Sequence, residues 1–274
     1  MPAAPTDPRK TPMQIARRFP LVALAVLPHL LTAAEAKPPE CTEIVEKARA
    51  HAGMGIDSGL ARIALTIQPA KGAPRHRTLE VRSAREKGLV RTLIRFLEPA
   101  DVAGTAFLLR ENADGPDEQI LYLPALKRTR RIAGTERRGS FMGTDFSYAD
   151  LEVRSLDDAE CTLEGEQSYR GQETYVVVTR PKAPSEDDLY GSVKLWIHKK
   201  TWIPLKVEFY DREDGALSKV MTVKRLKKVE GHWLPVETEM KNVKKGSSTR
   251  LELVEVEPGK SFPPETFTER ALER

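Results

Sequence analysis

The sequence predicts a mainly β (α+β) protein built on an antiparallel sheet that curls or closes. Two observations support this prediction. From residue 60 onward, run after run of residues suits a β-strand, and Asn, Asp and Gly punctuate these runs at turns. In the clearest runs, 193–198 and 204–211, apolar and polar residues alternate, so that one face of the sheet is apolar and the other is exposed to water.

The expected elements begin with a helix over 41–52. Ile44, Val45, Ala48 and Ala52 fall on one face at helical spacing, and Gly53 suits the end of the helix. The strands expected after it are 60–68, 77–84, 89–97, 104–110, 118–124, 126–132, 174–179, 193–199, 204–211, 218–226, 232–242 and 249–257. Many strands joined by short turns favour a sheet that curls on itself.

Two of these runs, 106–110 and 175–178, are apolar on both faces, so we expect each to be covered on both sides. Helices packed across an ordinary core would provide such cover. A curved sheet with an apolar cavity on its concave face, suited to an acyl chain, is the alternative. The strand pattern leaves both open.

Composition excludes several classes of protein. The 274 residues are 40% hydrophobic, which excludes a multi-pass membrane protein, a collagen and a wholly disordered chain. The net charge is 44 − 40 = +4, and half of it comes from residues 1–36, which carry four basic and two acidic residues. The remaining chain therefore has 40 − 38 = +2, which points to no particular partner.

Residues 1–36 have the pattern of a Sec-type signal peptide. Arg17 and Arg18 precede an apolar run over 19–31, and an Ala-Glu-Ala cleavage signal ends at residue 36. The apolar run is short for a membrane span, although an uncut N-terminal anchor is the alternative. Position 37 is Lys rather than the Cys of a lipoprotein, so we expect a cleaved, soluble periplasmic product and one domain over 37–274.

Two cysteines follow the cleavage site, Cys41 and Cys161. An oxidising compartment permits a disulfide between them, and a disulfide closing so long a loop would stabilise the fold. Two free or buried thiols are the alternative, because spacing alone does not bring the sulfurs within reach.

Catalytic and metal-binding motifs are not found in the sequence. HExxH, GxSxG, CxxC and the phosphate-binding loop are missing, and the histidines after the leader are scattered. We expect neither catalysis, nor a metal, nor a cofactor. Asp145 and Asp150 resemble an acid/base pair, but Ser147 three residues before Asp150 favours a capping box for a short helix over 148–151.

A basic run is the main charged feature, with Glu136 as its single acidic member. One interpretation is a solvated strand edge that resists pairing. The other is a surface for an anionic partner such as lipid phosphates, a membrane or an acidic protein patch. Export and the lack of interleaved aromatic residues argue against nucleic acid. The basic residues are Lys127, Arg128, Arg130, Arg131, Arg137 and Arg138.

The middle of the chain contains a set of distinctive segments, FLEP at 96–99 with Gly104-Thr105, YLPALKR at 122–128, and FMGTDFSYADL at 141–151. Later segments are LWI at 195–197, TWIPL at 201–205, WLP at 233–235 and FTERAL at 267–272. In these segments the chain resembles the outer-membrane lipoprotein-sorting family of periplasmic carriers, the LolA/LolB-like proteins, in a largely uncharacterised branch. The resemblance extends from about Ile44 to the C-terminus.

The resemblance implies an incomplete antiparallel β-barrel of about ten or eleven strands, with short helices as a lid over an apolar cavity. It implies a non-enzymatic monomer that shields lipoprotein or lipid acyl chains on the way to the outer membrane. The alternative function is an accessory protein that binds a lipid exporter of the RND type through residues 127–138. A transporter of the RND or ABC type in the inner membrane is an expected partner in either case.

We expect candidate residues for this cavity on the strands and in the 141–151 motif. The wall candidates are Phe96, Phe107, Leu109, Leu121, Leu123, Leu195 and Ile197. The lid candidates are Phe141, Met142, Phe146 and Tyr148, for which packing in an ordinary core is the alternative. Which face each strand residue occupies depends on register, because a slip of one residue reverses it.

Overall fold

The computed structural model describes residues 39–49, 58–113, 115–152 and 159–274. The chain divides into two units, Met1–Pro38 and Pro39–Arg274, and all the described elements belong to the second. The predicted signal peptide, residues 1–36, lies outside the described residues, as do the last three residues of the predicted helix.

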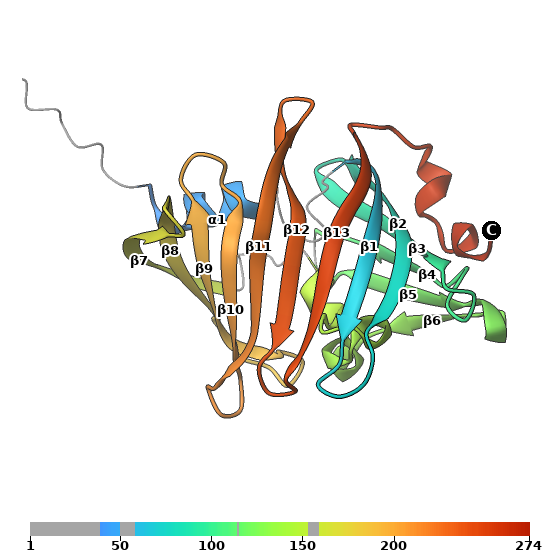
Figure 1. Cartoon of the computed structure of the whole chain (residues 1–274), viewed down its shortest axis with the longest axis horizontal. Helices are drawn as coiled ribbons and strands as arrows, with labels where there is room; N and C mark the ends of the chain where they lie inside the picture. Colours follow the sequence, from blue (N-terminus) through green and yellow to red (C-terminus); the bar gives the residue numbers. More distant parts are fainter. Residues whose placement is uncertain (1–38, 50–57, 114, 153–158) are drawn as a thin grey trace, which may run out of the picture. The chain divides into compact units, whose positions relative to one another are not determined.

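One antiparallel sheet of 13 strands dominates this unit (Figure 1). In spatial order it runs β6-β5-β4-β3-β2-β1-β13-β12-β11-β10-β9-β8-β7, with β6 and β7 as its two edges. The first group of strands is β1 Gly59–Gln68, β2 Arg75–Glu86, β3 Leu89–Glu98, β4 Ala106–Arg110, β5 Glu118–Leu123 and β6 Arg128–Ile132. The second group is β7 Ala159–Tyr169, β8 Gln172–Pro181, β9 Tyr190–His198, β10 Pro204–Asp211, β11 Leu217–Val229, β12 His232–Asn242 and β13 Ser247–Pro258.

The strand prediction was close but incomplete. The mainly β, antiparallel, open sheet is confirmed, whereas the estimate of ten or eleven strands was too low. Twelve of the 13 strands coincide with predicted runs, and β7 was missed. Its residues alternate from Ala159 to Glu164, but this edge strand contains few large apolar side chains and its inward positions are only half-buried, so its apolar signal is weak.

Successive strands are joined by hairpins except at one place. The chain runs from β1 out to the edge strand β6, and then passes to the other edge strand, β7, before returning strand by strand to β13 beside β1. The described part of this connection holds three short 3₁₀ segments, η2 Gly134–Arg138, η3 Phe141–Gly143 and η4 Tyr148–Leu151. A further one, η1 Pro124–Leu126, lies between β5 and β6.

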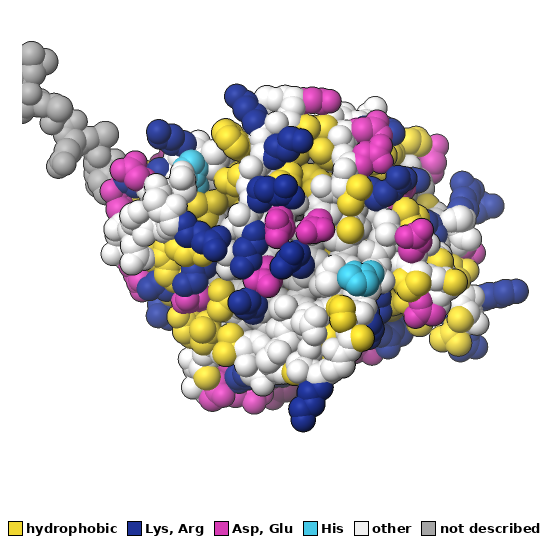
Figure 2. Space-filling model, in the orientation of Figure 1, with side chains coloured by type: hydrophobic (Ala, Val, Ile, Leu, Met, Phe, Trp, Pro, Cys, Tyr) yellow, Lys and Arg dark blue, Asp and Glu magenta, His cyan; other side chains and the backbone are white. Residues whose placement is uncertain are grey.

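The two faces of the sheet differ in chemistry. We call the face that carries Ile63, Leu65 and Leu79 the inner face; these side chains are at most 3% exposed. The opposite, outer face of the central strands is covered by basic and acidic side chains intermixed (Figure 2). Ion pairs such as Lys224–Glu239 at 2.7 Å and Arg62–Glu255 at 3.2 Å join neighbouring strands there. This amphipathic sheet agrees with the predicted alternation.

The run at 106–110 is covered on both faces, as predicted. Phe107 and Leu109 belong to the inner-face cluster, while Ala106 and Leu108 pack on the outer side against Phe267 and Leu272. The latter two lie in η5 Pro264–Phe267 and η6 Glu269–Glu273. Arg95 of β3 secures this C-terminal segment by donating hydrogen bonds to the carbonyl oxygens of Ala271 and Leu272, at 2.8 and 3.3 Å.

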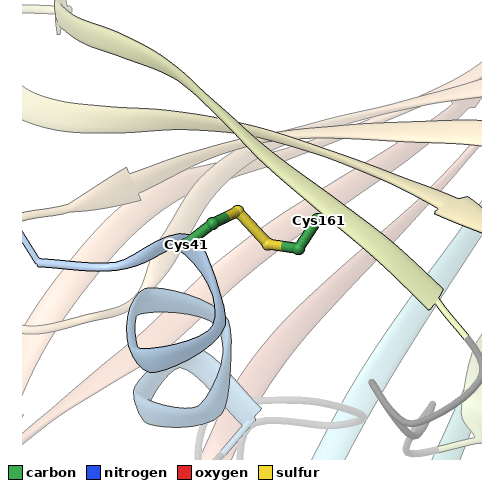
Figure 3. Close-up of a disulfide and its surroundings, with 2 residues drawn as sticks. All are labelled: Cys41 and Cys161. Atoms are coloured by element: carbon green, nitrogen blue, oxygen red, sulfur yellow. A yellow bond between two sulfur atoms is a disulfide. The ribbon is translucent and has the colours of Figure 1, made fainter.

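Helix α1, Cys41–Arg49, covers another part of the inner face near the β7 edge. Ile44 and Ala48 pack against Val177 and Ile197 of β8 and β9. Cys41 and Cys161 form a disulfide that joins the start of this helix to β7, which decides between the two alternatives that the sequence left open (Figure 3). At its other end Arg49 forms an ion pair with Glu111, after β4, at 3.0 Å.

Helix α1 therefore has contacts with both strand groups. The disulfide ties it to the second group, and the Arg49–Glu111 pair ties it to the first. Glu111 also accepts a hydrogen bond from the backbone N–H of Val90 at 2.7 Å. The sheet therefore holds this carboxylate in the position where Arg49 binds it. The helix thus links the β7 edge of the second strand group to the β3–β4 part of the first group.

Candidate functional site

The connection between the two edges contains a segment that lies against the inner face. We call residues 139–152 the bridging segment. It folds back on itself: the N–H of Phe141 donates to the carbonyl of Phe146 at 2.7 Å, and the N–H of Tyr148 donates to that of Gly139 at 3.1 Å. Met142 and Gly143 both have positive φ, of 50° and 73°, so the chain reverses sharply at this point.

Aromatic side chains of the bridging segment pack directly on the sheet. The ring of Phe141 lies 5.8 Å from that of Phe96 and 5.3 Å from that of Phe107. Tyr148 lies 5.6 Å from both Phe107 and Phe141. Such tilted and edge-on contacts are favourable beyond the apolar area that they bury. The segment is therefore part of the largest apolar cluster of the described residues.

Asp145 fastens the middle of the bridging segment to β13. Its carboxylate accepts hydrogen bonds from the hydroxyls of Thr249, at 2.8 Å, and Ser247. Its backbone N–H donates to Thr249 Oγ1 at 2.9 Å. Asp145 is 7% exposed and Thr249 is fully buried, so water does not compete effectively for these bonds.

Asp150 fastens the end of the bridging segment to β11 and β9. Lys219 of β11 lies 2.7 Å from Oδ2, and the Tyr190 hydroxyl donates to Oδ1 at 2.8 Å. The N–H of Ser147 also donates to Oδ2, at 2.7 Å, as the capping box predicts. The side chains of Asp150 and Lys219 are only 2% and 9% exposed. This is a buried, hydrogen-bonded ion pair.

The environment of Asp150 favours its charged form. Burial alone would raise the pKa of this carboxyl group, but the charge of Lys219 and the hydrogen bonds from Lys219 and Ser147 outweigh it. The pKa therefore lies below its ordinary value of 3.8. Asp150 remains ionised at neutral pH, and the pair with Lys219 persists.

Strands of the first group bind the bridging segment through its carbonyl oxygens. Arg75 and Arg77 of β2 donate to the carbonyls of Gly143, at 3.2 Å, and Met142. Gln119 of β5 donates to the carbonyl of Tyr148 at 3.2 Å. Together with the two aspartates, these bonds attach one short segment to both strand groups, at β2 and β5 on one side and β9, β11 and β13 on the other.

The structure brings most of the predicted wall and lid residues into a single cluster. Phe96, Phe107, Leu109 and Leu121 are at most 4% exposed, and Leu123 packs beside them. Phe141 and Tyr148 are buried in this cluster, with Met142 and Phe146 half-buried at its border. The other two predicted wall residues, Leu195 and Ile197, lie apart in the cluster under α1.

The two aspartates of the bridging segment serve to attach it to the strands. Both aspartates are engaged by donors from the strands, so the acid/base interpretation that the sequence suggested has no support in their geometry. No group of His, Cys, Asp and Glu side chains suited to a metal ion occurs within the described ranges. What the site offers is an extensive apolar surface and a covering segment held by polar bonds.

The predicted basic surface is divided in the structure. Arg137 pairs with Glu152 at 3.4 Å, and Arg138 with Glu213 at 3.2 Å. Arg131 pairs with Glu118, and Arg130 lies 3.6 Å from Glu136. Lys127 and Arg128 are exposed, at the edge of the sheet. The run therefore combines a basic strand edge with arginines that bind the body of the protein.

Sequence reasoning missed the polar partners of the two aspartates in the bridging segment, which include Tyr190, Lys219, Ser247 and Thr249. One signal was present in the sequence. Lys219, Met221 and Val223 share the inward face of a strand, and a lysine at the first of these positions breaks the apolar pattern. A charged residue on an inward face calls for a buried counter-charge. The hydroxyls of Ser247 and Thr249 gave no comparable signal.

A separate pocket of about 330 Å³ lies beside the C-terminal segment. Arg91, Arg110, Glu86 and Glu118 contribute to its lining, together with Phe267. This lining is strongly charged, so the pocket does not correspond to the apolar cavity that the sequence predicted. Among the described residues, no helix has the length and apolar composition that a membrane span requires.

Comparison with known proteins assigns the chain to a family. A solved structure of an outer membrane lipoprotein-sorting protein domain from Vibrio parahaemolyticus is 30% identical, with a TM-score of 0.77, and the match covers 85% of this chain and 98% of that one. The chain belongs to the outer-membrane lipoprotein-sorting family. A family model described only as that of an uncharacterized protein also matches residues 88–274. A search of the curated proteins found no match.

Two further solved structures show the same fold at lower identity. A DUF1329 family protein from Desulfovibrio piger is 23% identical with a TM-score of 0.77, over 85% of this chain and all of that chain. A LolA superfamily protein from Nitrosomonas europaea is 19% identical with a TM-score of 0.66, over 85% of this chain and 100% of that one. The lipoprotein-sorting fold is thus shared along nearly the whole described chain.

Proposed function

We propose that this lipoprotein-sorting family protein is a periplasmic carrier that shields the acyl chains of lipoproteins or lipids on their way to the outer membrane. One observation supports the proposal above all. A short segment with an aromatic face covers the apolar inner surface, and polar bonds from strands on both sides hold it there. Such a segment can leave the surface as a unit and uncover it for an acyl chain.

Burial of apolar surface would drive the binding of an acyl chain. Each methylene group removed from water contributes about 0.8 kcal/mol, so a long acyl chain needs an apolar surface to cross an aqueous compartment. A carrier needs that surface and a cover that opens, and it needs no covalent step. Phe141 and Tyr148 occupy the place where an acyl chain would contact Phe96 and Phe107.

The proposed location rests on the leader and the disulfide. Residues 1–36 are proposed to be a signal peptide cleaved before Lys37, which leaves one domain over 37–274. The Cys41–Cys161 disulfide is typical of an oxidising compartment such as the periplasm. The intact mass of the protein recovered from the periplasm tests the cleavage site, and a mass that retains residues 1–36 would contradict it.

Bound lipid is the direct test of the carrier. Native mass spectrometry of gently purified protein is expected to show adducts with the masses of phospholipid or acylated peptide. The matched pair of variants is Phe146→Asp, at the border of the bridging segment, and Phe262→Asp, which is half-buried beside the C-terminal segment. Phe146→Asp is expected to abolish binding of a fluorescent fatty acid while both variants stay folded. Equal binding by the two variants would contradict the proposed site.

A further inference from the structure

The hairpin between β11 and β12 has a tip unlike the rest of the outer surface. In Figure 1 it extends past the ends of the neighbouring strands. Glu230 and Gly231 form its two-residue turn, with φ of 48° and 88°, which is the backbone twist that a tight hairpin prefers. Val229 pairs with His232, and Lys228 pairs with Trp233, so the tip is ordered by the strand register up to the turn.

The indole of Trp233 is presented to solvent at this tip. Its residue is 44% exposed, one of the few large hydrophobic residues with such exposure among those described. Trp196 and Trp202, by contrast, engage lysines: Lys206 lies 4.2 Å from the first ring and Lys47 lies 4.4 Å from the second. An exposed tryptophan costs free energy in water and is most favourable where one end meets an apolar phase and the other stays wet.

The charges at the tip also differ from those below it. Along the body of the hairpin the basic residues have acidic partners, as in the pairs Lys224–Glu239 and Arg225–Glu237, at 2.7 and 3.7 Å. Lys227 and Lys228 are exposed, and no ion pair joins either of them to another described residue. Lys228 shares the face of Trp233, Lys227 lies on the other face of the hairpin, and Glu230 in the turn is the one acidic residue of 227–233, so the tip keeps a net positive charge.

We propose that this tip, formed by Lys227, Lys228 and Trp233, docks the protein on an anionic phospholipid surface. Tryptophan is enriched at the headgroup level of membranes, where its ring packs at the apolar boundary. Lysines next to it are attracted by anionic headgroups. A rigid, projecting hairpin can place all three side chains at the interface while the sheet stays in water. This docking site is separate from the proposed acyl-chain site, so either proposal can fail without the other.

The test compares vesicle binding of variants made in the full chain. Each protein is purified after expression of the whole gene, and its N-terminus is checked by mass. Co-sedimentation is measured with vesicles of phosphatidylcholine and phosphatidylglycerol in equal parts, and with phosphatidylcholine alone. The Lys227→Ala/Lys228→Ala variant is expected to lose roughly thirtyfold in partition to the anionic vesicles. Trp233→Ala is expected to lose about tenfold, and to keep that deficit at high salt, because its contribution is apolar.

The control changes the same charge at the opposite ends of the strands. Lys71 and Lys245 are exposed residues in the β1–β2 and β12–β13 turns. The Lys71→Ala/Lys245→Ala variant is expected to bind like the wild type. Thermal unfolding of every variant establishes that the fold is kept. The proposal would be overturned if both hairpin variants bound vesicles like the wild type, or if the control lost as much binding as they did. In the first case the tip would be free to bind a protein partner instead.

Discussion

At the scale of single residues, the buried pair of Asp150 and Lys219 is the interaction that most clearly fixes the bridging segment. A lysine on the inner face is unfavourable by itself, and so is a buried carboxylate. Each is tolerated because the other lies 2.7 Å away, and because Tyr190 and Ser147 complete the hydrogen bonds of the carboxylate. Removing one member should therefore be far more harmful than removing both.

The first prediction concerns Lys219→Met, which leaves Asp150 buried without its cation. We expect a loss of about 3–5 kcal/mol in the free energy of unfolding, measured by urea titration. The double variant Lys219→Met/Asp150→Leu should recover part of this loss. Lys241→Met is the control, because its side chain is 61% exposed, and we expect a change within about 0.5 kcal/mol. Equal losses at positions 219 and 241 would show that the pair does not hold the segment.

The second prediction is a pH dependence that arises from the same carboxylate. The pKa of Asp150 is lowered in the folded protein, so its contribution to stability is present above the ordinary value of 3.8 and is lost as the pH falls through the lower folded value. The difference in unfolding free energy between the wild type and Asp150→Asn should therefore be constant near neutral pH and shrink below 3.8. A difference that stayed constant throughout the acid range would contradict this assignment.

At the scale of elements, the sequence predicted those that bury apolar side chains in a regular pattern. Strands such as β1 and β10 alternate large apolar side chains with polar ones, whereas the edge strand β7 is mostly polar and its inward residues are small or half-buried, so its pattern is easily missed. The residues of the candidate site show the same difference between predictable and unpredictable positions. Its aromatic residues were predicted from the sequence, but Ser247 and Thr249 were not, because a hydroxyl becomes informative only once the fold places Asp145 beside it.

Helix α1 gives the third prediction. Its disulfide closes a loop with a sequence separation of 120 residues, and in the chain-entropy model a loop of this length contributes roughly 4–5 kcal/mol. The Cys41→Ser/Cys161→Ser variant should be destabilised by about this amount. A reducing agent should lower the stability of the wild type to that of the variant and leave the variant unchanged. If the variant unfolded at the same midpoint as the wild type, the contacts of Ile44 and Ala48 would be enough to hold the helix without the disulfide.

At the scale of the whole molecule, the question is whether the bridging segment is a permanent part of the core or a cover that opens. Its packing on Phe96 and Phe107 is compatible with both. The two differ in what happens when a polar attachment is weakened. A permanent core element loses stability, while a cover also exposes the inner face more often.

The last prediction uses Thr249→Val, which keeps the shape of the side chain and removes the hydroxyl that binds Asp145. We expect faster hydrogen exchange in residues 139–152 and faster binding of a fluorescent fatty acid, without loss of binding capacity. Thr238→Val on β12 is the control, since Thr238 is half-buried and shares its strand face with Met240. Should Thr249→Val lower stability but leave the binding rate as in the control, the segment would be core and the acyl chain would have to enter elsewhere on the inner face.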